Sequence, residues 1–99
     1  MRALFDIERR LDAVLHTVVP PRDRPSVDPS AVADLMGVGL DLAEVARNAE
    51  LIPRSLVGKS WFVFTSMLTA AEYAVDPEPI LDVAWQWEDV LRQAFGPDF

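Results

Sequence analysis

Apolar residues in the first part of the chain recur at alternating spacings of three and four. The residues are Leu4, Ile7, Leu11, Val14 and Val18. Because an α-helix completes a turn every 3.6 residues, this spacing places all five on one narrow face. Such a seam is typical of bundles and coiled coils, where the face is buried against other helices. The pattern predicts a helix over residues 2–19 that Pro20-Pro21 ends, since neither proline can continue it.

Further apolar periodicities, separated by prolines, predict three more helices at residues 29–48, 55–75 and 77–95. Asp28-Pro29 and Asp76-Pro77 each mark an entry, because the aspartate can accept from free backbone N–H groups and proline suits the first helical position. Gly96-Pro97 is a stop signal for the last helix.

Gly39 lies on the apolar face of the second predicted helix, and Gly37 lies opposite it. A glycine inside a helix costs about 1 kcal/mol relative to alanine. We therefore expect Gly39 to allow the close approach of a neighbouring helix.

Four helices joined by short links predict an all-α, four-helix antiparallel bundle of up-down-up-down order or a close variant. No strand alternation or hairpin signal competes with this reading. We expect one helical domain over residues 1–99.

The composition narrows the function classes. The 99 residues carry a formal charge of −7, with 16 acidic and 9 basic side chains. This balance disfavours nucleic-acid and anionic-membrane partners, which need clustered Lys and Arg. The most apolar stretch, Trp61 to Ala71, is too short to span a bilayer. The first six residues include the charged Arg2 and Asp6 and do not begin the apolar core of a signal peptide, so the expected location is the cytoplasm. With no cysteine, disulfides and thiolate sites are excluded.

Glu8, Asp12 and His16 form a row at four-residue spacing along the first helix. Two carboxylates and an imidazole could hold a divalent metal or relay a proton. The simpler interpretation is a polar rim in which Asp12 pairs with His16. Lys59 could be a Schiff-base lysine, but a stem along apolar surface with a solvated ammonium is the expectation.

No other set of residues has the spacing of a catalytic site. Ser55, Ser60, Thr65 and Ser66 have no sequence context that ties them to His16, and no Gly-x-Ser-x-Gly elbow occurs. We therefore expect neither a catalytic set nor a cofactor.

The negative charge is unevenly distributed. Residues 30–53 carry −3 and residues 76–99 carry −5, whereas residues 54–75 carry +1. On the last helix, two large apolar residues point away from the buried arc and are surrounded by charge. This candidate partner-binding patch consists of Leu81, Asp82, Trp85, Glu88, Asp89 and Arg92. A tryptophan ringed by charge is typical of a protein-binding surface. The alternative is that another helix or Phe99 covers Trp85.

Phe62 and Tyr73 fall on the far side of the third helix. If its own chain does not enclose that side, a symmetric homodimer would.

These observations support three hypotheses. The first is a non-catalytic protein-interaction module, in concrete form a small acidic antitoxin or immunity-type protein that binds a basic protein through the last helix. The second is a small-molecule or metal-binding helical protein, possibly an enzyme, with a site near Glu8, Asp12 and His16. The third is a structural homodimer or assembly subunit.

Overall fold

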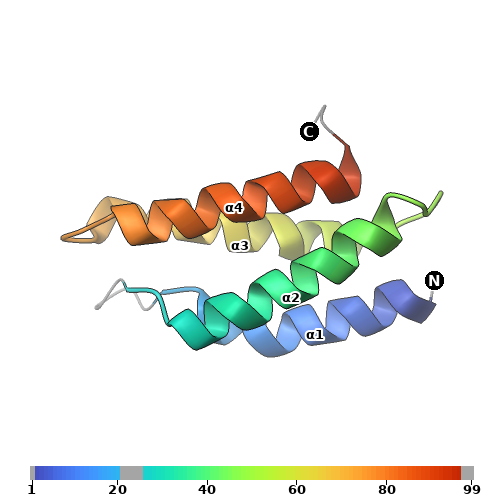
Figure 1. Ribbon diagram of the computed structural model, residues 1–99, viewed down its shortest axis with the longest axis horizontal. Coiled ribbons are helices and arrows are strands. Elements are labelled where there is room, and N and C mark those ends of the chain that lie inside the picture. Colours follow the sequence, from blue (N-terminus) through green and yellow to red (C-terminus); the bar gives the residue numbers. More distant parts are fainter. Residues whose placement is uncertain (1, 21–25, 97–99) are drawn as a thin grey trace.

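The protein is described by a computed structural model that places residues 2–20 and 26–96. These residues form four helices (Figure 1), α1 (Arg2–Val18), α2 (Pro29–Ala46), α3 (Arg54–Tyr73) and α4 (Glu78–Phe95). Their ends lie within two residues of the predicted ranges. Pro21, Pro97 and Phe99, which the sequence analysis had linked to helix ends or to the cover of Trp85, lie outside the described residues. None of the four helices has the length and apolarity needed to cross a bilayer.

Aspartate side chains accept backbone hydrogen bonds at the starts of α2 and α4. The Asp28 carboxylate accepts from the Ser30 N–H at 3.0 Å, with Pro29 in the first turn, as the sequence predicts. Asp76 accepts from the Glu78 N–H at 3.3 Å. In α4, however, Pro77 occupies the N-cap position, so the helix begins one residue later than predicted.

The helices run alternately up and down, as Figure 1 shows. Helix α1 packs against α2 and α3, and α4 packs against the same two helices. The pairs α1–α4 and α2–α3 are diagonal, and no Cα atoms of theirs approach within 8 Å among the described residues. The predicted all-α four-helix bundle is therefore confirmed, in a variant with parallel α1–α3 and α2–α4 neighbours.

The connection over residues 47–53 joins helices that are not neighbours. We expected each short link to join adjacent antiparallel helices, and this holds only for α1–α2 and α3–α4. Seven residues can span up to about 23 Å when extended, which is enough to cross the diagonal of a bundle whose neighbouring axes lie about 10 Å apart. The length of the link therefore allows either arrangement.

Trp87 of α4 is the largest side chain in the fully buried core. Its indole Nε1 donates to the backbone carbonyl of Ser60 on α3 at 2.8 Å. The Ser60 hydroxyl in turn donates to the Leu56 carbonyl at 2.7 Å, so both polar groups are satisfied in the apolar interior.

Gly39 of α2 makes room for this indole. A Cβ atom at Gly39 would lie 2.9 Å from Cζ3 of Trp87 and 3.2 Å from the Val90 methyl groups. The expectation of close helix approach at Gly39 is confirmed, and the approaching helix is α4. Gly37 lies on the opposite face of α2, and a Cβ atom added there would have no neighbour within 4 Å.

The two glycines give a matched stability prediction. Gly37→Ala should raise the free energy of unfolding by about 0.5–1 kcal/mol, because alanine has the higher helix propensity and no clash occurs. Gly39→Ala should lower it by roughly 1–2 kcal/mol, because the rigid indole cannot yield without repacking. Urea unfolding followed by circular dichroism measures both; equal stabilisation by the two variants would contradict the close packing.

The two tryptophans of α4 give a second prediction. Trp87→Phe should lower the free energy of unfolding by about 2–3 kcal/mol, because it removes a buried hydrogen bond and leaves a cavity. Trp85→Phe, at a half-exposed position of the same helix, should change it by less than about 1 kcal/mol. The same urea titration compares them, and a reversed order would show that the buried indole is not the anchor.

Candidate functional site

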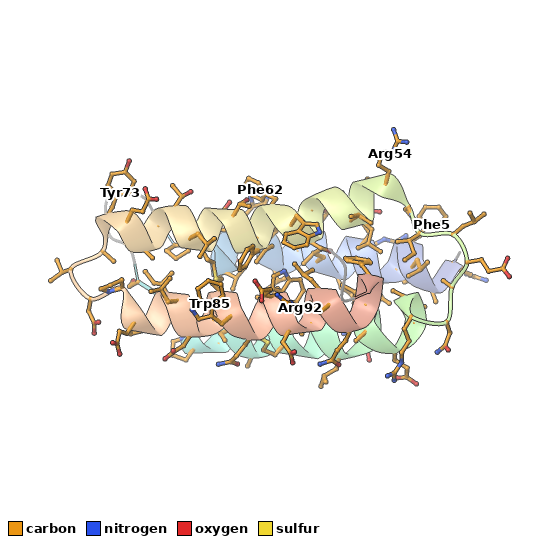
Figure 2. The ribbon with its side chains drawn as sticks, turned by 90° about the horizontal axis from the view of Figure 1, so that it is seen from above. Phe5, Arg54, Phe62, Tyr73, Trp85 and Arg92 are labelled. Carbon is orange, nitrogen blue, oxygen red and sulfur yellow. The ribbon has the colours of Figure 1, made fainter. Side chains whose placement is uncertain are left out.

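The six residues of the Trp85 patch all lie on α4: Leu81, Asp82, Trp85, Glu88, Asp89 and Arg92. The side chain of Trp85 is 51% exposed. Its ring leans on Phe64 of α3, with the ring centroids 5.8 Å apart, and Trp61 meets Phe64 edge-on at 5.6 Å. Figure 2 shows Trp85 and Arg92 along the seam between α3 and α4. Trp85 is thus an exposed aromatic ring that packs against the buried ring of Phe64, which in turn contacts Trp61.

Polar groups of the patch are arranged by helical spacing. Arg92 pairs with Glu88 one turn earlier at 3.3 Å, and Gln93 donates to Asp89 at 3.0 Å. Asp82 and Asp89 are exposed to solvent. Two carboxylates beside Trp85 therefore keep their charge available to a partner, while Glu88 is partly neutralised.

Leu81 differs from the expectation that it points away from the buried arc. It is half-buried and packs against the core. Leu81 lies one turn before Trp85, whose ring contacts Phe64, and so it is on the side of α4 that faces α3. The exposed apolar surface of the patch is therefore mainly that of Trp85.

The packing of the helices separates the charge into two halves of the bundle. Helix α2 carries three acidic and no basic side chains, and α4 carries four acidic and one basic, so this adjacent pair has a formal charge of −6. Helix α1 carries three of each sign, and α3 carries two basic and one acidic, so the other pair has +1. The folded molecule therefore has one strongly acidic half, formed by α2 and α4, and one nearly neutral half, formed by α1 and α3.

Lys59 of α3 forms a polar bridge to α1, which we call the Lys59 bridge. Its ammonium donates to Glu8 Oε2 at 2.7 Å and to Asp12 Oδ2 at 3.1 Å. The Ser55 hydroxyl donates to the other Glu8 oxygen at 3.0 Å. From the sequence we expected a solvated Lys59 head and did not foresee this pairing. The side chain stays 35% exposed, and the parallel neighbours α1 and α3 bring its ammonium opposite both carboxylates.

The row of Glu8, Asp12 and His16 therefore faces a cation of its own chain. Asp12 binds Lys59, and His16 lies exposed one turn further along α1. Among residues 2–20 and 26–96, no three His, Asp or Glu side chains converge so as to hold a metal ion.

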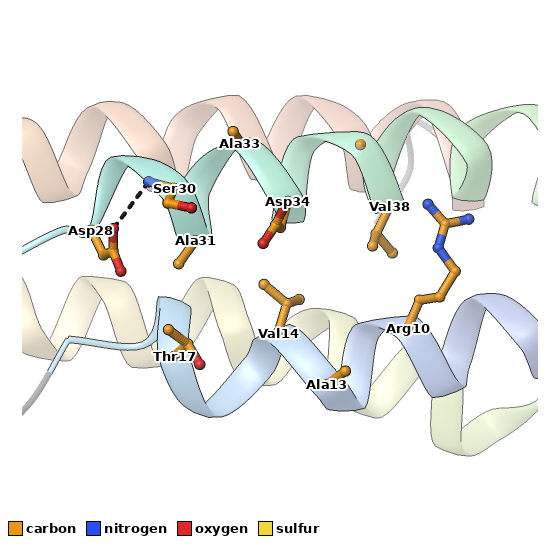
Figure 3. Close-up of a pocket in the computed structure, with 11 residues that line it drawn as sticks. Arg10, Ala13, Val14, Thr17, Asp28, Ser30, Ala31, Ala33, Asp34 and Val38 are labelled. Atoms are coloured by element: carbon orange, nitrogen blue, oxygen red, sulfur yellow. Dashed lines mark hydrogen bonds between the residues drawn. The ribbon is translucent and has the colours of Figure 1, made fainter.

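Two open grooves lie away from the Trp85 patch. One, between α1 and α2, is lined mainly by small residues, with Asp28 and Arg10 toward its two ends and Asp34 between them (Figure 3). Arg10 is itself paired with Asp41 across the two helices. The other, which we call the α1–α3 groove, has a volume of about 530 Å³. It is lined by Val19, Pro20, Phe62, Thr65, Ser66, Thr69, Ala70 and Tyr73.

Two of the hydroxyl side chains of α3 donate to backbone carbonyls of their own helix. Ser60 is buried and bonded to Leu56, and Thr65 donates to the Trp61 carbonyl within its own helix. Neither is poised for attack on a substrate.

Comparison of the chain with family models, with curated proteins and with solved structures gives no match in any of the three. The function of the chain must therefore be inferred from its own surface.

Sequence reasoning found the exposed tryptophan but missed the Lys59 bridge and the joining of the two acidic helices. Both depend on which helices are neighbours. The one signal available beforehand was that the sole lysine and the Glu8–Asp12 row each border an apolar face.

The Lys59 bridge predicts an alkaline loss of stability. The hydrogen bond to Glu8, which has the larger effect, and the hydrogen bond to Asp12 raise the pKa of Lys59 above its ordinary value. A raised pKa in the folded state stabilises the fold below the unfolded value of about 10.4 and loses that contribution as the pH rises through the folded value. The wild-type Tm should therefore fall as the pH rises above about 10.

The control is Lys59→Arg, whose guanidinium stays charged over this range. Thermal scans at successive pH values should show a flatter alkaline decline for Lys59→Arg and for Lys59→Met than for the wild type. Because Lys59 is the sole lysine, no other lysine obscures the comparison. Parallel declines in all three proteins would contradict a role for the bridge.

Proposed function

We propose that this chain is a non-catalytic protein-interaction module that binds a basic protein partner through the Trp85 patch of α4. A small acidic protein of the immunity or antitoxin type, which neutralises a partner by covering a basic surface, is the concrete form of this proposal.

The half-exposed Trp85 is the observation that carries the proposal. Tryptophan is enriched among the residues that dominate binding energy at interfaces. Its ring rests on Phe64, so part of the ordering cost of binding is already met by the fold. The exposed carboxylates of Asp82 and Asp89 on the same helix supply the charged rim that surrounds such an anchor.

The charge of the α2–α4 pair supports a basic partner. A formal charge of −6 on two adjacent helices creates a field that attracts cationic surfaces and increases their association rate. Binding that depends on this field weakens with salt, because the Debye length falls from about 10 Å at 0.1 M to about 3 Å at 1 M.

Affinity capture with the immobilised full chain tests the proposal. The chain is incubated with lysate of its host, and bound proteins are identified by mass spectrometry and ranked by isoelectric point. We expect a basic protein to be retained by the wild type and lost, by about tenfold or more, from Trp85→Ala and from Asp89→Arg.

Two matched variants control for general loss of apolar surface or charge. Phe62→Ala removes an aromatic residue with the same 51% exposure from α3, and Asp6→Arg reverses an exposed charge on α1. Both should retain the partner, and raised salt should release it. Retention of every captured protein by Trp85→Ala and Asp89→Arg would refute the assignment of the patch.

A further inference from the structure

The side of the molecule formed by α1 and α3 exposes three aromatic residues. Phe5 on α1 is 52% exposed, and Phe62 and Tyr73 on α3 are 51% and 57% exposed. Figure 2 shows all three on the same side of the bundle, away from Trp85. The α1–α3 groove opens between Phe62 and Tyr73. Exposed aromatic residues beside a groove mark a candidate interaction site.

Charge indicates which half of the bundle can pair with its own copy. Two α2–α4 halves of −6 each would repel one another across an interface. The α1–α3 half, with a formal charge of +1, carries no such penalty, and its Glu8, Asp12 and Lys59 are already paired within the chain. Homodimer interfaces are more apolar than other surfaces, which fits the same half.

The register of α1 and α3 gives the geometry of such a pair. Glu8 binds both Ser55 and Lys59, so along the bundle Glu8 lies level with Val57, midway between them on α3. Counting at 1.5 Å per residue, Phe5 lies level with Arg54, about 12 Å before Phe62. The α3 residues that line the α1–α3 groove run from Phe62 to Tyr73, so its middle lies between Met67 and Leu68, about 8 Å beyond Phe62.

Phe5 and the middle of the groove therefore lie on opposite sides of Phe62 along the helices. A two-fold axis at Phe62, lying in the interface and perpendicular to the helices, places Phe5 of one copy level with Ala70 of the other, a residue that lines the groove. The same axis brings the two copies of Phe62 together. In an isologous dimer each contact occurs twice, so one apolar knob and one groove per chain are self-complementary.

We propose that a second copy of this chain covers the α1–α3 side in an antiparallel two-fold dimer, with Phe5 of each copy in the α1–α3 groove of the other. This dimer leaves the Trp85 patch of both copies on the outside. It does not rest on the proposed function, since each can fail without the other.

Sedimentation equilibrium of the full chain tests the association. We expect the wild type to sediment at twice the mass of the 11.1-kDa chain at micromolar concentration. Phe62→Arg should raise the dissociation constant by about tenfold or more. Leu40→Arg, at an exposed position of α2 on the acidic half, should leave it unchanged. Circular dichroism verifies that each variant is folded.

Disulfide trapping tests the register, and the absence of cysteine from the chain gives a clean background. Phe62→Cys should form a covalent dimer under mild oxidation. Phe5→Cys alone should not, because the two copies lie about 24 Å apart along the helices. The double variant Phe5→Cys with Thr69→Cys should crosslink between chains, since about 22 Å separates the two positions within one chain.

The outcomes separate the alternatives. A wild type that stays monomeric at millimolar concentration overturns the dimer. Efficient crosslinking of Phe5→Cys alone overturns the proposed register, because an axis at Phe62 keeps the two copies of Phe5 about 24 Å apart. Disruption by Leu40→Arg but not by Phe62→Arg places self-association elsewhere and also overturns the proposal.

Discussion

The buried indole of Trp87 is the contact on which the rest of the bundle depends. One side chain of α4 donates a hydrogen bond to the Ser60 carbonyl of α3 and fills the space that Gly39 leaves on α2. A polar N–H inside an apolar core is costly unless it has a partner, so the indole accepts only the arrangement that supplies one. Trp87 thereby places α4 between α2 and α3, and α1 takes the remaining position beside them.

The separation of charge follows from this arrangement. With α4 beside α2, the two helices with the largest net negative charge become neighbours, and α1 and α3 are left with a nearly neutral surface. If α2 had packed beside α3 instead, acidic and neutral helices would alternate around the bundle. The same contact that orders the core therefore creates one acidic half and one half that exposes aromatic residues.

Local signals in the sequence accounted for the helices and their ends, because each depends on residues within a turn or two. Asp28 caps α2 through the amide two residues later, and the apolar spacing marks the buried face of every helix. Gly39 was also readable, since a glycine on a buried helical face is costly without a close neighbour. The partial burial of Leu81 and the two partners of Lys59 were not foreseen, because both depend on how the helices pack against one another.

The sequence by itself determined four amphipathic helices, their order and their alternating direction, because periodicity, caps and prolines act locally. It also determined that Trp85 has no place on the buried face of its own helix. Only the tertiary structure decided which helices are neighbours, since a seven-residue link can reach either an adjacent or a diagonal position. That decision assigned Lys59 to Glu8 and Asp12, joined the acidic helices into one half, and put Phe5, Phe62 and Tyr73 on one side.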